Sequence, residues 1–162
     1  MMDKFQFRNA MSYLTGAVNI ITTSGKEGFH GFTASAVCSV TDSPPTLLVC
    51  MNSQSALYPY FVQNETLAVN VLRAGQEDIS AIFANPHIDR DTRFASARWS
   101  SLRSGAPILE DALVGFDCRI IQTHTLGTHT IFYSEILAIH CQEDQERNEG
   151  LVYYNRKYHA IG

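Results

Sequence analysis

The chain has 162 residues, of which 45% are hydrophobic and 17% charged, a composition typical of one globular domain. Its formal net charge of −4, from 12 basic and 16 acidic residues, argues against a nucleic-acid-binding surface. The apolar runs are far shorter than a membrane span, the first residues do not resemble a signal peptide, and the four cysteines form no CxxC pair. We therefore expect a single cytoplasmic domain over residues 1–162 that contacts neither nucleic acid nor a membrane.

The first half of the chain alternates between helical and strand patterns. In chain order it predicts a helix near 7–14, a strand over 17–23, a strand from 31 that ends at 42–45, a strand over 46–52, a helix over 53–64, a strand over 66–72 and a helix over 76–85. The prolines at 44 and 45 end the second strand because they cannot continue a sheet, and Pro59 suits the first turn of a helix.

The second half begins irregularly and returns to strands. It predicts a long excursion with short helical turns over 86–109, a hairpin of strands 112–125 and 127–142 that turns near Gly127, a solvated turn over 143–150 and a last strand over 151–159. Six or seven strands with short connections and about three helices favour a mainly β fold, an antiparallel barrel with flanking helices, over a doubly wound parallel sheet.

Common catalytic motifs are missing from the chain. It contains no GxGxxG, HExxH or GxSxG, so the usual dinucleotide turn, a zinc protease and an α/β-hydrolase are not indicated. His124 and His129 lie five residues apart across the predicted turn without a convincing set of carboxylates. We expect no metal site.

The strand that begins at residue 31 has one unusual face. Read with period two, one face is apolar and consists of Phe32, Ala34, Ala36, Cys38 and Val40. The other face carries three hydroxyls, on Thr33, Ser35 and Ser39, beside Val37. Small side chains leave space beside the backbone, and hydroxyls that leave water need partners. This face predicts room for a planar ligand, although serines that merely fill a strand edge would give the same pattern.

A second polar group follows the next strand. Asn52, Ser53 and Ser55 crowd the strand end just before the predicted helix, where backbone N–H groups and hydroxyls can hold an anion. Together the two groups suit a planar ring and a phosphate. A simple helix cap is the alternative interpretation.

Two further segments could contact the same ligand. His129 follows a glycine turn, and the tail over 153–159 places Arg156 and His159 among tyrosines. Cations interleaved with aromatic rings suit a phosphorylated aromatic ligand through ion pairing and stacking. An ordinary loop histidine and a solvated C-terminal edge are the alternatives.

Five segments match a known family in order and separation. They are AVNIITT, GFTASAVCSVTDSPPTLLVCMN, LAVNVL, GTH…FYSEI and LVYYNRKYH. Over about residues 5–159 the chain resembles the short-chain flavin reductases of two-component monooxygenases, and among them the reductase components of 4-hydroxyphenylacetate 3-monooxygenases. The resemblance implies a homodimeric antiparallel Greek-key FMN-binding split barrel.

The resemblance also implies an enzyme, an NAD(P)H:flavin oxidoreductase. Such an enzyme reduces FMN, FAD or riboflavin by hydride transfer from nicotinamide C4 to flavin N5 and supplies the product to an oxygenase component. The choices between FMN and FAD and between NADH and NADPH stay open. Two other functions also stay open: a flavoprotein that retains FMN and passes electrons to a corrinoid or ferric centre, and a flavin-binding module without activity.

The resemblance assigns site residues as well. It implies flavin contacts at Phe32, Thr33, Ala34, Ser35, Ala36, Ser39, Val40, Asn52, Ser53, Gln54, Ser55, Ala56, Leu57, Phe83 and Ala84. It implies that the pyridine-nucleotide side consists of Tyr154, Arg156, Tyr158 and His159. His129 is the expected catalytic residue, which orients the nicotinamide, and Thr128 stands where many members carry aspartate.

Overall fold

A computed structural model describes residues 1–142, 146 and 148–162. Its helices are α1 (Lys4–Met11), α2 (Tyr58–Asn64), α3 (Glu77–Ala84) and α4 (Arg90–Ala95). Its strands are β1 (Gly16–Ala17), β2 (Asn19–Gly25), β3 (Gly28–Ala34), β4 (Val37–Asp42), β5 (Pro45–Asn52), β6 (Thr66–Val71), β7 (Trp99–Ser101), β8 (Pro107–Leu109), β9 (Val114–Leu126), β10 (His129–Cys141), β11 (Gly150–Tyr154) and β12 (Lys157–Ile161).

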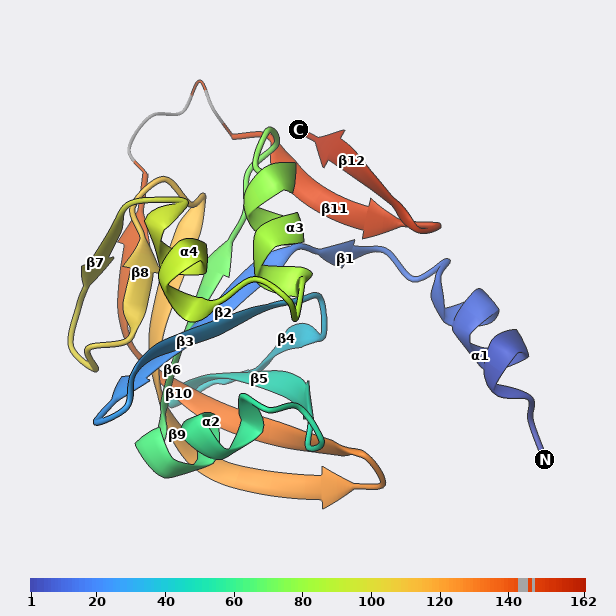
Figure 1. Ribbon diagram of the computed structural model, residues 1–162, viewed down its shortest axis with the longest axis horizontal. Coiled ribbons are helices and arrows are strands. Elements are labelled where there is room, and N and C mark those ends of the chain that lie inside the picture. The colour runs from blue at the N-terminus through green and yellow to red at the C-terminus, as the bar shows by residue number, and fades with distance from the viewer. Residues whose placement is uncertain (143–145, 147) are drawn as a thin grey trace.

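Seven of these strands form one antiparallel sheet in the order β3-β2-β6-β9-β10-β5-β4. The two edge strands, β3 and β4, are consecutive in the chain, and only Ser35 and Ala36 separate them. A link of two residues spans no more than roughly 10 Å, so the two edges of the sheet must approach each other. The sheet therefore curves round into a barrel with a seam between β3 and β4 (Figure 1). The predicted mainly β, antiparallel fold with flanking helices is confirmed.

The prediction of one continuous strand from residue 31 is wrong. β3 pairs with β2 and ends at Ala34, whereas β4 pairs with β5 and begins at Val37. Ala36 and Cys38 are exposed, and Val40 is 46% exposed, so the predicted apolar face is not a core face beyond the break. The reason is that β4 lies at the edge of the sheet, where these side chains meet no second layer.

Three other boundaries differ from the sequence-based expectations. Residues 53–57 form a turn, and α2 begins only at Tyr58, with no serine side chain capping it. The tail is a hairpin of β11 and β12 in place of a single strand. Residues 86–109 contain α4 and the short pair β7–β8. The predicted turn over 143–150 lies largely outside the described residues.

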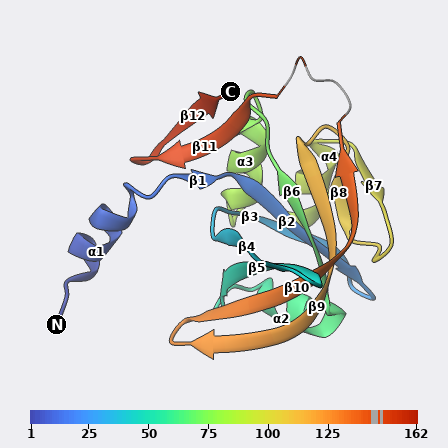
Figure 2. The same cartoon turned by 180° about the vertical axis from the view of Figure 1, so that it is seen from behind.

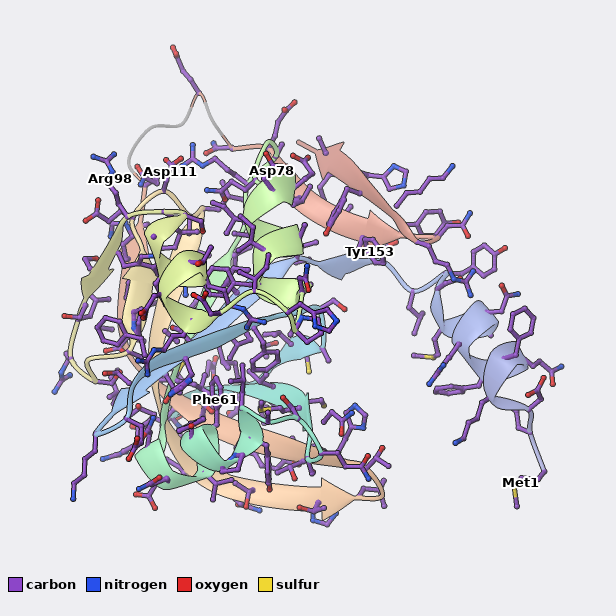
Figure 3. The ribbon with its side chains drawn as sticks, in the orientation of Figure 1. Met1, Phe61, Asp78, Arg98, Asp111 and Tyr153 are labelled. Carbon is purple, nitrogen blue, oxygen red and sulfur yellow. The ribbon has the colours of Figure 1, made fainter. Side chains whose placement is uncertain are left out.

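The core is divided between the two faces of β2. Ile21 packs inside the barrel with Phe61 of α2 and Phe132 of β10, and Figure 3 shows Phe61 within the body of the molecule. Ile20 points to the opposite face, where it packs with Phe83 of α3 and other buried residues. Adjacent strand residues point to opposite faces, so β2 is buried on both sides and fixes α3 relative to the barrel.

The N-terminal helix stands apart from this body. α1 projects from the barrel in both ribbon views (Figures 1 and 2), and none of its residues is buried. Its base is tied to the tip of the β11–β12 hairpin, since the Asn155 N–H donates to the Ser12 carbonyl at 2.7 Å. Among the described residues, no helix is both long and apolar enough to span a bilayer.

Substitution of Gly31 can test how closely α3 packs against β3. A Cβ atom at this position would lie 2.9 Å from the Phe83 ring and 3.2 Å from the Ile21 carbonyl oxygen. We expect Gly31→Ala to lower the free energy of unfolding by about 1–3 kcal/mol, measured by urea denaturation. Phe83→Leu in the same chain should recover part of this loss by removing the ring. Strictly additive effects of the two substitutions would contradict the close packing.

Candidate functional site

A cavity of about 630 Å³ lies at the barrel seam, within the usual range for small-molecule sites. Three segments and two histidines form its walls. They are the end of β3 with the following link (Gly31–Ala36), the end of β5 with the following turn (Cys50–Asn52 and Ser55–Leu57), the α3–α4 region (Phe83, Ala84, Pro86, Ile88, Arg90, Arg93 and Phe94), His30 and His129. The lining is mainly apolar or small, with a few polar groups.

The cavity brings together most of the sequence-predicted residues. Those that line it are Phe32, Thr33, Ala34, Ser35, Ala36, Asn52, Ser55, Ala56, Leu57, Phe83, Ala84 and His129. Those that do not are Ser39, Val40, Ser53, Gln54, Tyr154, Arg156, Tyr158 and His159. A role in binding stays a prediction for both sets.

Sequence reasoning missed the α3–α4 side of the cavity. The main omissions are His30, Arg90 and Arg93, together with Pro86 and Ile88. A usable signal was present: Asp89 caps α4 by accepting from the Thr92 N–H at 2.8 Å, and an aspartate three residues before such an amide is a common helix start. That signal would have located α4 but not its position beside β3.

The hydroxyls of the 31–39 segment have different roles. Thr33 Oγ1 donates to the Ser80 carbonyl of α3 at 2.7 Å, so it joins β3 to α3. The Ser80 hydroxyl is in turn hydrogen-bonded to the Tyr158 hydroxyl of β12 at 2.8 Å. Ser35 lies in the link across the seam, is exposed and lines the cavity. Of the hydroxyls on the cavity wall, that of Thr33 is therefore engaged with α3, and Ser35 is the exposed one.

Unpaired backbone donors lie on both sides of the seam. Among the described residues, the N–H groups of Ser35, Ala36 and Ala56 have no hydrogen-bond acceptor. The other amides of the 53–57 turn already have acceptors; for example, Asn52 Oδ1 accepts from the Gln54 N–H at 2.9 Å. Three residues of the cavity wall therefore carry backbone donors without an acceptor, and only one of these amides lies at the helix start where a broader anion site was predicted.

Two arginines line the far end of the cavity, and they differ in what they can bind. Arg93 is buried and donates to three carbonyls, of Gly31 at 2.7 Å, Asn85 at 2.6 Å and Ile88 at 3.1 Å. It thus holds the α3–α4 connection against β3. Arg90 is exposed; its Nη1 donates to the Glu27 carbonyl at 2.6 Å, and its Nε lies 3.6 Å from Asp91 Oδ1 in an exposed ion pair. Its Nη2 is left for an anionic group.

His30 is a buried imidazole on the cavity wall. Its ring stacks on Tyr60 with centroids 3.6 Å apart, and its Nε2 has no hydrogen-bond partner among the described residues. Burial is the main cause that lowers the pKa of His30 below 6.5, and the Arg90 guanidinium lowers it further, against the opposing effect of Glu27. His30 is therefore held neutral in the folded protein.

His129 begins β10 directly after the hairpin turn. Gly127 adopts a φ of +59°, which a two-residue hairpin turn requires at its first position. The Thr128 hydroxyl lies 2.9 Å from His129 Nδ1, so it can orient the imidazole. Pairing of His129 with Asn52 across β10 and β5 places the ring beside the 52–57 turn.

No group of three His, Cys, Asp or Glu side chains able to hold a metal ion occurs in the described part of the chain. The fold and the cavity thus define an antiparallel β-barrel with a small-molecule site at its seam. Backbone amides, one available cation and an oriented histidine provide its polar chemistry.

Comparisons with known proteins assign this barrel to a family. Residues 11–162 match the model of the flavin reductase like domain. Proteins named FMN reductase (NADH) RutF are similar: that of Serratia proteamaculans (strain 568) is 50% identical over 99% of this chain and 89% of the relative, and that of Escherichia coli (strain SMS-3-5) is 52% identical over 99% and 95%. The chain belongs to the flavin reductase family.

Solved structures agree with this assignment. A crystal structure assigned as a flavin reductase from Haemophilus somnus has a TM-score of 0.94 and 50% identity, covering 99% of this chain and 100% of that one. The Streptomyces globisporus NADH:FAD oxidoreductase SgcE6, in complex with NAD and FAD fragments, has a TM-score of 0.89 and 27% identity, covering 99% and 93%. The protein is an oxidoreductase of the flavin reductase class, and its cofactors are a flavin and a nicotinamide nucleotide.

His30 should make the stability of the protein sensitive to acid. Since the unfolded chain takes up a proton near pH 6.5 and the folded chain does so only at lower pH, the free energy of unfolding should fall as the pH drops from 6.5. His30→Phe keeps an aromatic ring on Tyr60 and should flatten the curve between pH 6.5 and roughly pH 5, measured by denaturation at each pH. His87→Phe, at an exposed position, should follow the wild-type curve. An unchanged slope in His30→Phe would show that His30 is not held neutral.

Proposed function

We propose that the protein reduces freely exchanging FMN with NADH and releases the product for use by a separate oxygenase component. The observation that carries this proposal is the meeting of three unpaired backbone donors, one available cation and His129 on a single cavity. The names of the relatives that are 50% and 52% identical, FMN reductase (NADH), support the choice of FMN and NADH.

A flavin fits the residues that line the cavity. Small side chains at Ala34, Ser35 and Ala36 leave the wall open to a flat ring, and the cavity volume suits a ligand of this size. The N–H groups of Ser35, Ala36 and Ala56 would donate to the polar edge of the ring. When bound, the flavin supplies the acceptor for a hydride from the nicotinamide.

The protein's own contribution is to bind and orient the two partners. Backbone donors fixed on the link and on the turn stabilise negative charge that develops on the ligand during the reaction, because they need no reorganisation. His129 would position the nicotinamide or its carboxamide, and Thr128 would hold the imidazole in place. Arg90, at the far end of the cavity, would pair with the phosphate and so favour FMN over riboflavin.

Substitution of His129 should affect the binding of NADH and of FMN differently. We expect His129→Ala to raise the KM for NADH by about tenfold or more while the FMN dissociation constant, measured by fluorescence quenching, changes less than about twofold. NADH oxidation is followed at 340 nm. Gln122→Ala, on an exposed part of the same hairpin, is the control. Equal damage to both constants would show that His129 serves the flavin.

The same assay distinguishes the proposed reductase from a second candidate function, that of a flavoprotein that retains its FMN. Saturable turnover of added FMN supports the reductase. Tight, stoichiometric FMN with no turnover of free flavin supports transfer to another bound acceptor. NADH loss no faster with the protein than without it would contradict both.

The proposed acceptor of the reduced flavin is a separate oxygenase component. BorF, named as the flavin reductase component of a two-component tryptophan halogenase, is 28% identical to this chain with a TM-score of 0.89. Its name supports the delivery of reduced flavin to a second protein. The oxygenase of 4-hydroxyphenylacetate is one candidate, on the basis of the sequence resemblance alone.

A second copy of the chain would cover the exposed face of α1. Four apolar residues of this region lie open to solvent, with Phe5 73% and Leu14 67% exposed beside Phe7 and Met11, and Figure 3 shows Met1 at the far end of this arm. Exposed apolar surface of this kind marks an interface, so the protein would be a homodimer.

Sedimentation can test the dimer. We expect a dimer at micromolar concentration and a monomer for the Phe7→Glu/Met11→Glu double variant, because two buried charges oppose association. Lys4→Glu, which changes charge on the same helix without touching the apolar residues, should remain a dimer. A monomeric wild-type protein would contradict the proposal.

A further inference from the structure

Thr130 lies one residue beyond His129 and has an unusual environment. It is 1% exposed, and its hydroxyl lies within hydrogen-bond distance of three other hydroxyls. These are Ser53 Oγ at 2.9 Å, Tyr58 Oη at 3.0 Å and Thr125 Oγ1 at 2.9 Å. A hydroxyl can donate one hydrogen bond and accept two, so Thr130 can satisfy all three partners at once.

The three partners come from three different segments. Thr125 lies on β9, Ser53 lies in the turn after β5, and Tyr58 begins α2. A backbone hydrogen bond joins the same turn and hairpin: the Ser53 N–H donates to the Thr128 carbonyl at 2.9 Å. These hydrogen bonds join the β9–β10 hairpin to the first residue of the 53–57 turn, Ser53, and to Tyr58, which directly follows the turn.

These two joined segments lie side by side, and both contribute to the cavity wall. The turn presents the free Ala56 amide, and the hairpin presents His129. Alternation along β10 directs Thr130 away from the side on which His129 lies, so Thr130 does not line the cavity. Regular sheet pairing continues through Asn52 but not through residues 53–57. Beyond Asn52, the hydrogen bonds of Ser53 and Tyr58 are therefore the ones that join the turn region to the hairpin.

We propose that Thr130 is a positioning residue that fixes the 53–57 turn relative to His129, and thereby sets the spacing between the flavin-binding wall and the nicotinamide-binding histidine. The identity of the two ligands in this proposal rests on the proposed function. The hydroxyl cluster is an observation of the structure and is independent of that function. A buried cluster of hydroxyls is costly when one partner is removed, because the remaining groups lose their hydrogen bonds without regaining water.

The test compares Thr130→Val with Thr130→Ser. Valine keeps the shape and removes the hydroxyl, whereas serine keeps the hydroxyl. In Thr130→Val we expect amide hydrogen exchange at Ser53 to be about tenfold faster, and both the KM for NADH and the FMN dissociation constant to rise about five- to tenfold. Thr130→Ser should stay within about twofold of wild type in all three.

Thr22→Val is the matched control for a general loss of stability. Thr22 is also buried, and its hydroxyl donates to the Pro107 carbonyl at 2.6 Å, away from the cavity. It should lower the melting temperature, as Thr130→Val does, while Ser53 exchange and both constants remain at wild-type values. Unchanged Ser53 exchange in Thr130→Val, or a Thr130→Ser variant as impaired as the valine variant, would overturn the positioning role.

The two proposals can fail separately. If the wild-type protein does not oxidise NADH with FMN, the proposed function is wrong, and the exchange at Ser53 alone decides the role of Thr130. If the wild type is active and Thr130→Val loosens the turn while both constants stay within about twofold, Thr130 only stabilises the fold and the positioning role is wrong.

Discussion

The structure depends on how two consecutive strands are placed at opposite edges of one sheet. β3 and β4 are separated by Ser35 and Ala36 alone, yet five other strands lie between them in the sheet order. The chain can satisfy this order only if the sheet closes on itself, so the short link forces barrel closure. In this link the Ala36 carbonyl still accepts from the Cys50 N–H of β5, but the N–H groups of Ser35 and Ala36 have no strand partner and are left for another acceptor.

This constraint explains why the cavity and the seam coincide. Backbone polar groups that sheet pairing does not use must meet water, a side chain or a ligand. Small residues in the link keep the seam open, and the turn after β5 brings a further free amide to the other side. Hydrogen bonds from Arg93 on one side, and from the hydroxyls around Thr130 on the other, hold the surrounding elements in place. Buried side chains thus hold the cavity walls together, and unpaired backbone N–H groups remain at the seam.

The fold was largely predictable from local pattern, because most elements carry their own signal. The apolar runs of β5 and β6, the acidic start of α3 and the Gly127 turn each identify one element without reference to the rest of the chain. The break at Ser35 was not predictable in this way, because the alternation of residue types continues across it. The β11–β12 turn was also hidden, since its left-handed positions are Asn155 and Arg156 in place of glycine.

The site was predictable only in part. The family resemblance identified the link, the turn and His129; the link, His129 and residues 55–57 of the turn line the cavity. It did not identify Arg90 or Arg93, which reach the cavity through contacts between α4 and β3 that are distant in sequence. It also missed His30, which lies on β3 just before the predicted residues. Nor could it identify Thr130, whose hydroxyl meets three segments that come together only in the folded barrel.

The central claim is that the free amides at the seam receive the flavin ring. NMR of the ¹⁵N-labelled protein titrated with FMN tests it most directly, with ADP-ribose as the comparison ligand. The amide resonances of Ser35, Ala36 and Ala56 should shift strongly with FMN and little with ADP-ribose. If the resonances of these three amides do not shift while FMN shifts the resonances of other residues in the barrel, the seam is not the flavin site.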